Sequence, residues 1–542
     1  MAKPRVAVID AETDPFKHGE TIEPFCWGFY DGDIYIDFWG PDCTNQLIQY
    51  LLSRHDKLII YAHNGGKFDF YYLIDFITNP LKIINGRIVS AALGHHRLRD
   101  SFAIIPVPLA AYQKDTIDYD KFTKAARDKN KKEILRYLYS DCMYLYSLVF
   151  AFVERFGAKL TIGSTAIKEI EKLHPFARMN DVHDAIYRPY YYGGRCECFE
   201  AGVLPGNWRV YDVNSMYPHV MRGRDHCSGK QYFVAHNATA LLNPRGEFIH
   251  DPHKPYFARI VAQSTGALPW RHDDGSLVFP IGGIREYNAT SHEIQTALRH
   301  RLLKIISVES LHVCLNPINF SRFVDTYYAE KVAAKKVGDK ISEMFSKFLL
   351  NSGYGKFGTN PANFKDWKIV RVGDPNPGME WEFHSQVYDC EIYSKQTPAD
   401  YWQYFDVATA ASITGASRAV LLDAMPYATR MAYCDTDSII CEDLALPEDP
   451  HTLGGWKLEA RGDRLLIGGK KLYALTNGGA PIDDSGKLEK IASKGIRATV
   501  AQIMDICNGK NFTYNNPAPS FSLTRGVRYI SRTVSYNARI ES

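Results

Sequence analysis

Residues 211–218 read Tyr-Asp-Val-Asn-Ser-Met-Tyr-Pro, and residues 433–438 read Tyr-Cys-Asp-Thr-Asp-Ser. The first stretch begins in a predicted strand, and the second lies at the turn of a hairpin predicted at 431–441. A bare Asp-Thr-Asp is often only a turn. Because each stretch carries its aspartate at the end of a strand, we expect the two strands to meet and to bring Asp212 and Asp437 together.

The composition is that of an ordinary globular protein. Of 542 residues, 45% are apolar and 23% are charged, and this length predicts at least two domains. No run of about 18 apolar residues occurs, so we expect no membrane span, and the first residues lack the apolar core of a signal peptide. The eleven cysteines follow no disulfide or zinc spacing, which predicts reduced thiols in a cytoplasmic protein.

Charge is distributed unevenly along the chain. The net charge is only +3, but from residue 490 onward eight basic residues stand against two acidic ones, a local excess of +6. Five aromatic residues are interleaved with them. Such a tail fits a phosphate backbone, although a solvated basic surface would have the same composition.

A second group of carboxylates begins in the N-terminal third. Asp10 and Glu12 follow an apolar strand predicted at 6–9, and their spacing of two places both on one face of an extended chain. Asp69 follows a second strand, predicted at 58–61. Asp-x-Glu by itself is more often an exposed turn, so a metal site is predicted only if the next helix supplies a further carboxylate.

That helix, predicted at 133–152, carries Asp141 in the middle of its apolar stripe, with Tyr137 one turn before it. A buried carboxylate is costly unless it is paired or bound to a cation. Carboxylates that converge repel one another by about 4 kcal/mol per pair at 4 Å and an effective dielectric constant near 20. A hydroxyl or an arginine is the alternative partner for Asp141, but the whole set favours a divalent metal, Mg²⁺ or Mn²⁺.

In their order and spacing these segments resemble the motifs of family B DNA polymerases. The three exonuclease motifs are matched by Asp10-x-Glu12, by Asn64-x-x-x-Phe68-Asp69 and by Tyr137-x-x-x-Asp141, and motifs A and C by residues 211–218 and 433–438. The resemblance runs from Val6 to about Gly495. It implies a mixed α/β chain, with a ribonuclease-H-like exonuclease joined to a right-hand polymerase that has palm, fingers, thumb and two insertions.

The resemblance also implies roles in the 3′→5′ exonuclease. Two divalent ions would be held by Asp10, Glu12, Asp69 and Asp141, with Tyr137 in the catalytic group. The segment 114–119 resembles one of the protein-primed branch, in which a lysine, here Lys114, assists phosphodiester cleavage. The frayed primer end would be held by Asn64, Phe68, Ser101, Phe102 and Tyr119.

In the polymerase half the resemblance implies that Asp212, Asp437 and the backbone carbonyl of Val213 hold two divalent ions for in-line phosphoryl transfer. Asp435 would be a supporting carboxylate. Tyr217 would be the steric gate that lies under the deoxyribose and excludes a 2′-hydroxyl.

A helical region predicted at 321–356 resembles the fingers. Lys340, Lys347, Asn351 and Tyr354 fall within an arc of roughly 60° at 3.6 residues per turn. This stripe suits an incoming dNTP, because lysine meets its phosphates as a point charge and tyrosine packs beside the nascent base pair.

Two positions in the fingers depart from the family pattern. Gly353 stands where a bulky apolar residue is usual, which we expect to loosen the end of the helix near the template. The second triphosphate-binding lysine is expected at Lys331, with Lys335 as its rival, because the spacing to Lys347 is longer than usual.

Smaller motifs would hold DNA. Tyr191-x-Gly193-Gly194 resembles the Y-x-G-G motif between the two halves, which contacts the template, and Thr414-x-x-x-Arg418 resembles a second template-binding motif. Lys471-x-Tyr473 resembles the K-x-Y motif that steadies the primer terminus.

The gaps from Asp212 to Lys347 and from Tyr354 to Thr414 are longer than a minimal palm and fingers need. The resemblance to protein-primed phage polymerases, which carry insertions at both places, implies the domain plan. We expect an exonuclease domain at 1–160 and a polymerase domain at 161–542, in which the palm is about 161–221 and 406–490, the insertion that docks a priming protein about 222–318, the fingers about 319–356, the strand-displacement insertion about 357–405, and the thumb about 491–542.

The sequence therefore predicts a monomeric, protein-primed phage replicase that binds primer-template DNA, dNTPs and a terminal protein in the host cytoplasm. Two alternatives stay open at this point. One is a stand-alone 3′→5′ exonuclease with a decayed polymerase half, and the other is a non-catalytic DNA-binding replication factor.

Overall fold

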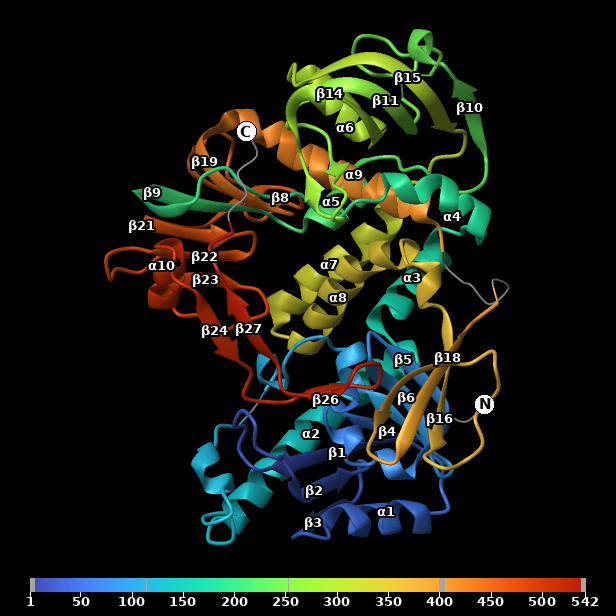
Figure 1. The fold of residues 1–542 in the computed structure, drawn as a ribbon, viewed down its shortest axis with the longest axis vertical. Helices are drawn as coiled ribbons and strands as arrows, with labels where there is room; N and C mark the ends of the chain where they lie inside the picture. The colour runs from blue at the N-terminus through green and yellow to red at the C-terminus, as the bar shows by residue number, and fades with distance from the viewer. Residues whose placement is uncertain (1–4, 114, 252, 399–404, 538–542) are drawn as a thin grey trace.

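A computed structural model of the chain describes residues 5–113, 115–251, 253–398 and 405–537. Strands and helices both occur along the whole chain, which confirms the mixed α/β class (Figure 1). Of the helices in these ranges, none is both long and apolar enough to cross a membrane. Three sheets and the helices between them carry the functional residues.

The largest sheet gathers the N-terminal strands (blue in Figure 1). Its described strands are, in spatial order, β17 (Glu382–Val387), β18 (Cys390–Gln396), β16 (Lys365–Arg371), β5 (Ile77–Ile84), β6 (Arg87–Leu93), β7 (His96–Asp100), β4 (Leu58–Ala62), β1 (Arg5–Thr13), β2 (Pro24–Tyr30) and β3 (Tyr35–Trp39). Alternate residues of β1 pack on opposite faces, against helix α1 (Cys43–Ser53) on one side and α2 (Lys131–Phe156) on the other. The strand runs on past Ile9, so Asp10 and Glu12 lie within it and not after it.

The excursion predicted after the fingers joins this N-terminal sheet. It forms the strands β16, β17 and β18, as the predicted hairpin-like excursion requires, and Trp367 of β16 pairs with Leu81 of β5. Ile369 and Ile392 are buried in the same apolar core as the N-terminal strands. The sheet thus spans the first domain and the second insertion of the predicted plan; the predicted end of the excursion near residue 400 lies outside the described residues.

A second sheet forms the predicted palm. Its described strands are, in spatial order, β23 (Glu489–Ser493), β22 (Leu472–Thr476), β21 (Trp456–Gly469), β9 (Gly202–Val213), β20 (Ser438–Leu444), β19 (Ala428–Asp435) and β8 (Cys196–Cys198). The hairpin predicted at 431–441 is confirmed as β19 and β20. Helices α5 (Met216–Gly223) and α9 (Val407–Ala424) pack with it in one apolar core.

The insertion predicted at about 222–318 is a compact layer of its own (top of Figure 1). The strands β10 (Tyr232–His236), β15 (Leu303–Cys314), β11 (Tyr256–Thr265) and β14 (Ile281–Thr290) form an antiparallel sheet that buries its core against helix α6 (Ser291–Arg299). A small hairpin, β12 (Trp270–Arg271) with β13 (Leu277–Val278), extends from it.

The fingers are two helices, α7 (Ser321–Val337) and α8 (Lys340–Phe357). Directly after the domain boundary expected at 160/161, helix α3 (Ile162–Leu173) begins, capped by Thr161. Gly353 does not loosen α8, because the helix continues to Phe357. A Cβ at position 353 would lie 2.5 Å from Ile170 Cδ1, so the glycine lets α3 pack closely on α8.

The C-terminal part extends from the palm back to the N-terminal sheet (red in Figure 1). Its elements are α10 (Val500–Cys507), β24 (Phe512–Asn515), β25 (Ser520–Ser522), β26 (Gly526–Arg528) and β27 (Ser531–Val534). Helix α4 (Asp181–Tyr187) lies earlier in the chain, before β8. Phe521 and Leu523 are buried in the N-terminal core, and the N–H of Leu523 donates to the carbonyl of Gly86 at 3.3 Å.

The α3–α8 contact predicts opposite effects of one substitution at two glycines of α8. Gly353→Ala adds a Cβ that must displace Ile170, whereas Gly355→Ala adds one with no atom within 4 Å. Alanine favours a helix by up to about 1 kcal/mol over glycine, but overpacking costs about 1–3 kcal/mol. We expect Gly355→Ala to raise the midpoint of thermal unfolding and Gly353→Ala to lower it; equal midpoints in parallel melts would contradict the close contact.

Candidate active sites

The two aspartates of the predicted polymerase site lie side by side at one edge of the palm sheet. Asp212 is next to last in β9, and Asp437 lies in the turn between β19 and β20. Ser438 pairs with Asp212 in the antiparallel ladder, and the N–H of Val213 donates to the carbonyl of Asp437 at 2.8 Å. The register of the sheet therefore brings the two carboxyl groups together, as the sequence predicts.

The electrostatics of this pair fit a divalent cation. Burial, and then the carboxylate of Asp437, raises the pKa of Asp212 to about 7. Burial, and then the carboxylate of Asp435, raises the pKa of Asp437 to about 6. Both shifts show that negative charge is unfavourable here without a positive partner. Because all the donors are oxygen, the residues suit the predicted Mg²⁺ or Mn²⁺.

Asp435 has a partner within the protein. The Nζ of Lys471 donates to both of its carboxylate oxygens at 2.8 Å, and the backbone N–H of Lys471 donates to the Tyr433 hydroxyl at 2.9 Å. Tyr473 lies beside Tyr433, with ring centroids 5.1 Å apart. An aspartate neutralised in this way agrees with the supporting role expected for Asp435.

Glu459 was missed by the sequence reasoning. It lies in β21 where the register with β9 shifts between Leu458 and Ala460, and β-bulges of this kind re-aim a side chain. Its carboxylate is among the charges that raise the pKa of Asp212, after burial and Asp437. Lys490 pairs with it at 2.7 Å. The sequence gives no signal for it, because charged residues such as Lys457, Arg461 and Asp463 alternate with apolar ones around Glu459 in β21.

Tyr354 of the predicted nucleotide stripe on α8 contacts Tyr217, the predicted steric gate. The rings of Tyr217 and Tyr354 stack with centroids 3.8 Å apart and planes 14° from parallel. Lys340, Lys347 and Asn351 are exposed on the same helix. The pKa of Lys331 is lowered by burial and then by the charge of Lys347, so these two ammonium groups lie near each other. That proximity favours Lys331 over Lys335 as the second triphosphate lysine.

The predicted template motifs form one buried assembly. Thr414 and Arg418 lie inside α9, each only 2% exposed, and so are not on a surface that DNA can reach directly. Arg418 donates to the carbonyls of Tyr192 at 2.9 Å and Gly193 at 2.8 Å. Tyr191 and Gly193 line an open groove of about 660 Å³ together with Arg188 and Arg271. Arg418 therefore holds the loop that carries Tyr191, Gly193 and Gly194.

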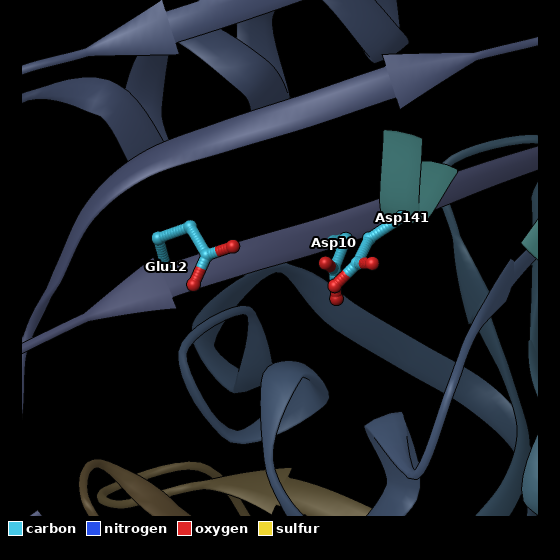
Figure 2. Close-up of side chains that lie close together, drawn as sticks. All are labelled: Asp10, Glu12 and Asp141. Carbon is cyan, nitrogen blue, oxygen red and sulfur yellow. The ribbon is translucent and has the colours of Figure 1, made fainter. Parts of the chain in front are cut away.

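Three of the four predicted exonuclease carboxylates converge. Ligand oxygens of Asp10, Glu12 and Asp141 all lie within 4.8 Å of one another. Figure 2 shows the carboxyl groups of Asp10 and Asp141 close together, with Glu12 farther along the same strand. Asp69 lies outside this cluster, and its burial raises its pKa to about 7. The cluster has the oxygen donors that a divalent cation requires, and Lys114 lies outside the described residues.

The residues predicted to hold the primer end have different surroundings. The hydroxyls of Tyr119 and Tyr137 are 3.3 Å apart, and Tyr119 is 53% exposed. Ser101 is fully buried and donates to the carbonyl of Ala62, so its role would be indirect. Phe68 contacts Phe521 of the C-terminal part, with ring centroids 5.5 Å apart.

Arg87, on β6, is a second residue that the motifs did not reveal. Its guanidinium pairs with Asp100, donates to Asn64 Oδ1 at 2.8 Å and lies 4.8 Å from the ring centroid of Phe102. It thus connects two of the predicted single-strand-binding segments. A lone arginine between motifs carries no signal in a single sequence.

A cavity of about 1700 Å³ lies between the N-terminal sheet, the end of α8 and the C-terminal hairpin β25–β26. Its basic lining residues are Lys67, Lys82, Arg188, Lys356, Lys365, Arg525 and Arg528, against one acidic residue, Asp366. The Ser385 hydroxyl of β17 donates to the carbonyl of Leu523. Segments from three distant parts of the chain therefore close around a positively charged space.

Comparisons with known proteins agree with this geometry. The sequence pattern of the family described as "DNA polymerase type B, organellar and viral" matches residues 105–380. The chain is 40% identical to the DNA-directed DNA polymerase of Enterobacteria phage PRD1, over 98% of each chain. It is 24% identical to the DNA polymerase of Streptococcus phage Cp-1, over 86% of this chain and 83% of that one.

Among solved structures, Phi29 DNA polymerase complexed with primer-template DNA and incoming nucleotide substrates superposes with a TM-score of 0.70. The match covers 98% of this chain and 100% of the other at 17% identity. At that identity the likeness shows that the fold is shared.

The raised carboxyl pKa values predict how Mg²⁺ stabilises the protein at different pH. Asp212, with a pKa of about 7, and Asp437, with a pKa of about 6, bind protons more tightly in the folded than in the unfolded chain. Their contribution to stability is therefore present at low pH and is lost as pH rises from about 4 to 7. Because a cation must displace those protons, Mg²⁺ should raise the unfolding midpoint at pH 8 and barely at pH 5. Asp212→Asn should reduce the effect at pH 8; an equal effect at both pH values would count against the site.

Proposed function

The chain belongs to the type B DNA polymerases of viruses and organelles and is a DNA-directed DNA polymerase, and from this premise we propose that it polymerises at Asp212 and Asp437 and proofreads at a separate 3′→5′ exonuclease site. The observation that carries the proposal is the register that pairs Ser438 with Asp212, because it gathers the two carboxylates at one sheet edge. A purely DNA-binding factor would have no use for such a costly pair.

In both sites the bound divalent ions would supply the positive charge that activates the attacking oxygen and stabilises the leaving group. In polymerisation, Asp212, Asp437 and the Val213 carbonyl would hold them. Lys471 keeps Asp435 neutralised, and Lys490 does the same for Glu459, so the remaining negative charge is concentrated on the catalytic pair. The primer terminus would lie beside Lys471 and Tyr473.

Nucleotide selection would take place against the stacked tyrosines. Lys347 and Lys331 offer two positive charges to the triphosphate, and Asn351 offers a hydrogen bond on the same face of α8. Tyr217 would lie under the sugar, supported from behind by the ring of Tyr354. A 2′-hydroxyl would have to displace this packed pair.

Proofreading would use the cluster of Asp10, Glu12 and Asp141. Asp69 is a further candidate ligand, and Lys114 would assist cleavage as it does in similar enzymes. The Tyr119 and Tyr137 hydroxyls are positioned to hold the scissile phosphate region, while Phe68 and Phe102 would hold the last bases by stacking.

Separate sites predict separable losses. Asp437→Asn should abolish primer extension and leave degradation of single-stranded DNA near the wild-type rate, because Asn keeps the shape but loses the charge. Asp141→Asn should do the reverse. Both are measured on one labelled primer, with and without dNTPs; loss of both activities in either folded variant would mean that the two sites are not independent.

We further propose that initiation uses a terminal protein and that the enzyme works in the cytoplasm of the phage host. The insertion at about 222–318 is a separate layer with its own core, which suits a docking module.

The same protein would displace the non-template strand as it moves. Support for this comes from the basic cavity, which is lined by residues of the β16–β18 strands and the β25–β26 hairpin.

In a closed cavity only one strand would pass, and the other would be forced off the duplex. Separation of a base-pair step costs on the order of 1.4 kcal/mol, which nucleotide incorporation can supply. The fold shows that β16–β18 cannot simply be deleted as a test, because Ile369 and Ile392 belong to the N-terminal core. The C-terminal hairpin is the part that can be released.

Releasing the hairpin should separate gap filling from strand displacement. The double change Phe521→Ala and Leu523→Ala removes both buried anchors, at a cost of about 2–5 kcal/mol each to docking. We expect gap filling to persist while synthesis through duplex from a nick stops. Val527→Ala, on the same hairpin but 37% exposed, is the control. If the double variant copies long duplexes as the control does, this hairpin does not close the path.

A further inference from the structure

Two buried arginines tie the insertion to the loop that carries Tyr191, Gly193 and Gly194. Arg418 lies in α9 and Arg195 follows the loop directly; they are 2% and 3% exposed. The Arg418 guanidinium contacts the insertion on one side and the loop on the other, whereas the Arg195 guanidinium contacts the insertion at Gly266 and pairs with Glu197 of β8. No predicted motif includes these contacts.

Arg418 takes its orientation from Glu293 of α6. Its Nε donates to Glu293 Oε1 at 2.7 Å, and its Nη1 donates to the carbonyls of Tyr192 and Gly193. Glu293 is 1% exposed and also accepts the N–H and hydroxyl of Thr290 in a capping box. A Cβ on Gly415 would lie 2.4 Å from Thr290 Oγ1, so this glycine lets α6 and α9 approach closely enough for the pair to form.

Arg195 holds the other end of the loop. Its Nη2 donates to the carbonyl of Gly266 in the insertion at 2.7 Å, and its guanidinium lies 4.2 Å from the ring centroid of Phe279. Its own carbonyl accepts the N–H of Thr436, the residue between Asp435 and Asp437, at 2.6 Å. A Cβ on Gly194 would meet Thr436 Oγ1 at 2.7 Å, so loop and catalytic turn are in direct contact.

We propose that Glu293 is a positioning residue for templated synthesis: through Arg418 it fixes the loop that lines the template groove and abuts the catalytic turn. The proposal rests on the proposed polymerase function of Asp212 and Asp437. The insertion would then be a second support of the polymerase site as well as a docking module.

The chemistry explains why a carboxylate is needed at position 293. A guanidinium offers its donors in a rigid planar fork, so anchoring Nε fixes the direction in which Nη1 points. Charge-assisted hydrogen bonds are the strong ones, and both partners here are shielded from water. With the carboxylate neutralised, the fork can rotate, and the two loop carbonyls lose their shared donor. The Tyr191 ring, which lies against Gly358 at the end of α8, would shift with them.

The test compares Glu293→Gln with a matched pair between the same two helices. Arg299 of α6 and Asp423 of α9 form an ion pair at 2.8 Å whose side chains are 59% and 42% exposed, so Arg299→Gln breaks an α6–α9 contact that does not reach the loop. KM for primer-template DNA and kcat are measured for extension, and degradation of single-stranded DNA is measured on the same samples.

We expect Glu293→Gln to raise KM for primer-template DNA about tenfold, the scale of one charge-assisted hydrogen bond. Changes in kcat and in degradation should stay small, and Arg299→Gln should match the wild type. A purely structural role would reduce the folded fraction and lower both activities together without moving KM. In case the uncompensated arginine prevents folding, the double variant Glu293→Gln with Arg418→Gln removes both buried charges and should show the same rise in KM.

Three results would overturn the proposal. They are an unchanged KM in the folded variants, an equal rise in Arg299→Gln, and a parallel loss of extension and degradation at constant KM. If the wild-type protein itself fails to extend primers, the proposed function falls first, and that outcome is visible before any variant is compared.

Discussion

Two like charges held close together in a partly buried site are the constraint on which the palm depends. At 4 Å, a pair of carboxylates repels by about 4 kcal/mol at an effective dielectric constant near 20. The backbone register of β9 with β20 holds Asp212 and Asp437 against that repulsion. Lys471 and Lys490 form ion pairs with the flanking acids Asp435 and Glu459, and their charges, with that of Lys457, only partly offset the raised pKa values of the central pair. A bound cation would therefore be stabilised most strongly between Asp212 and Asp437.

The N-terminal site meets the same constraint with a different scaffold. Asp10 and Glu12 share one face of a strand, and Asp141 approaches from a helix whose apolar stripe packs on that sheet. Because strand and helix are each rigid, neither carboxylate can retreat from the other without unpacking the core. Both sites therefore use secondary structure to hold repelling groups, and both have the oxygen donors that suit a hard divalent cation.

Site residues whose positions depend on local periodicity and on the order of motifs could be predicted from the sequence. Asp141 could be placed because its position in an apolar stripe is visible in one helix, and Asp212 and Asp437 because each lies near the end of a strand. Glu459, Arg87 and Glu293 were missed, since their partners lie far away in the chain and a single acid or base has no local pattern. Arg418 was recognised by motif, but only its burial shows that it would act on the template through the loop. The union of β16–β18 with the N-terminal sheet depends on long-range contacts, such as the pairing of Trp367 with Leu81 and the hydrogen bonds between Asn79 and Ile369, which no local signal encodes.

Around the basic cavity, the charged lining residues and the apolar anchors have different roles. The wall of the cavity is lined by basic side chains that suit a phosphate backbone. Because these side chains repel one another, they cannot hold the walls of the cavity together. Closure depends on the apolar anchors Phe521 and Leu523. Burying two such side chains contributes about 1.5–3 kcal/mol each, which corresponds to an open fraction on the order of 10⁻² to 10⁻⁴. In the strand-displacement path proposed above, a closure of that strength would stay shut during synthesis and would still open often enough to admit a strand, whereas a larger apolar seal would trap the enzyme on or off its template.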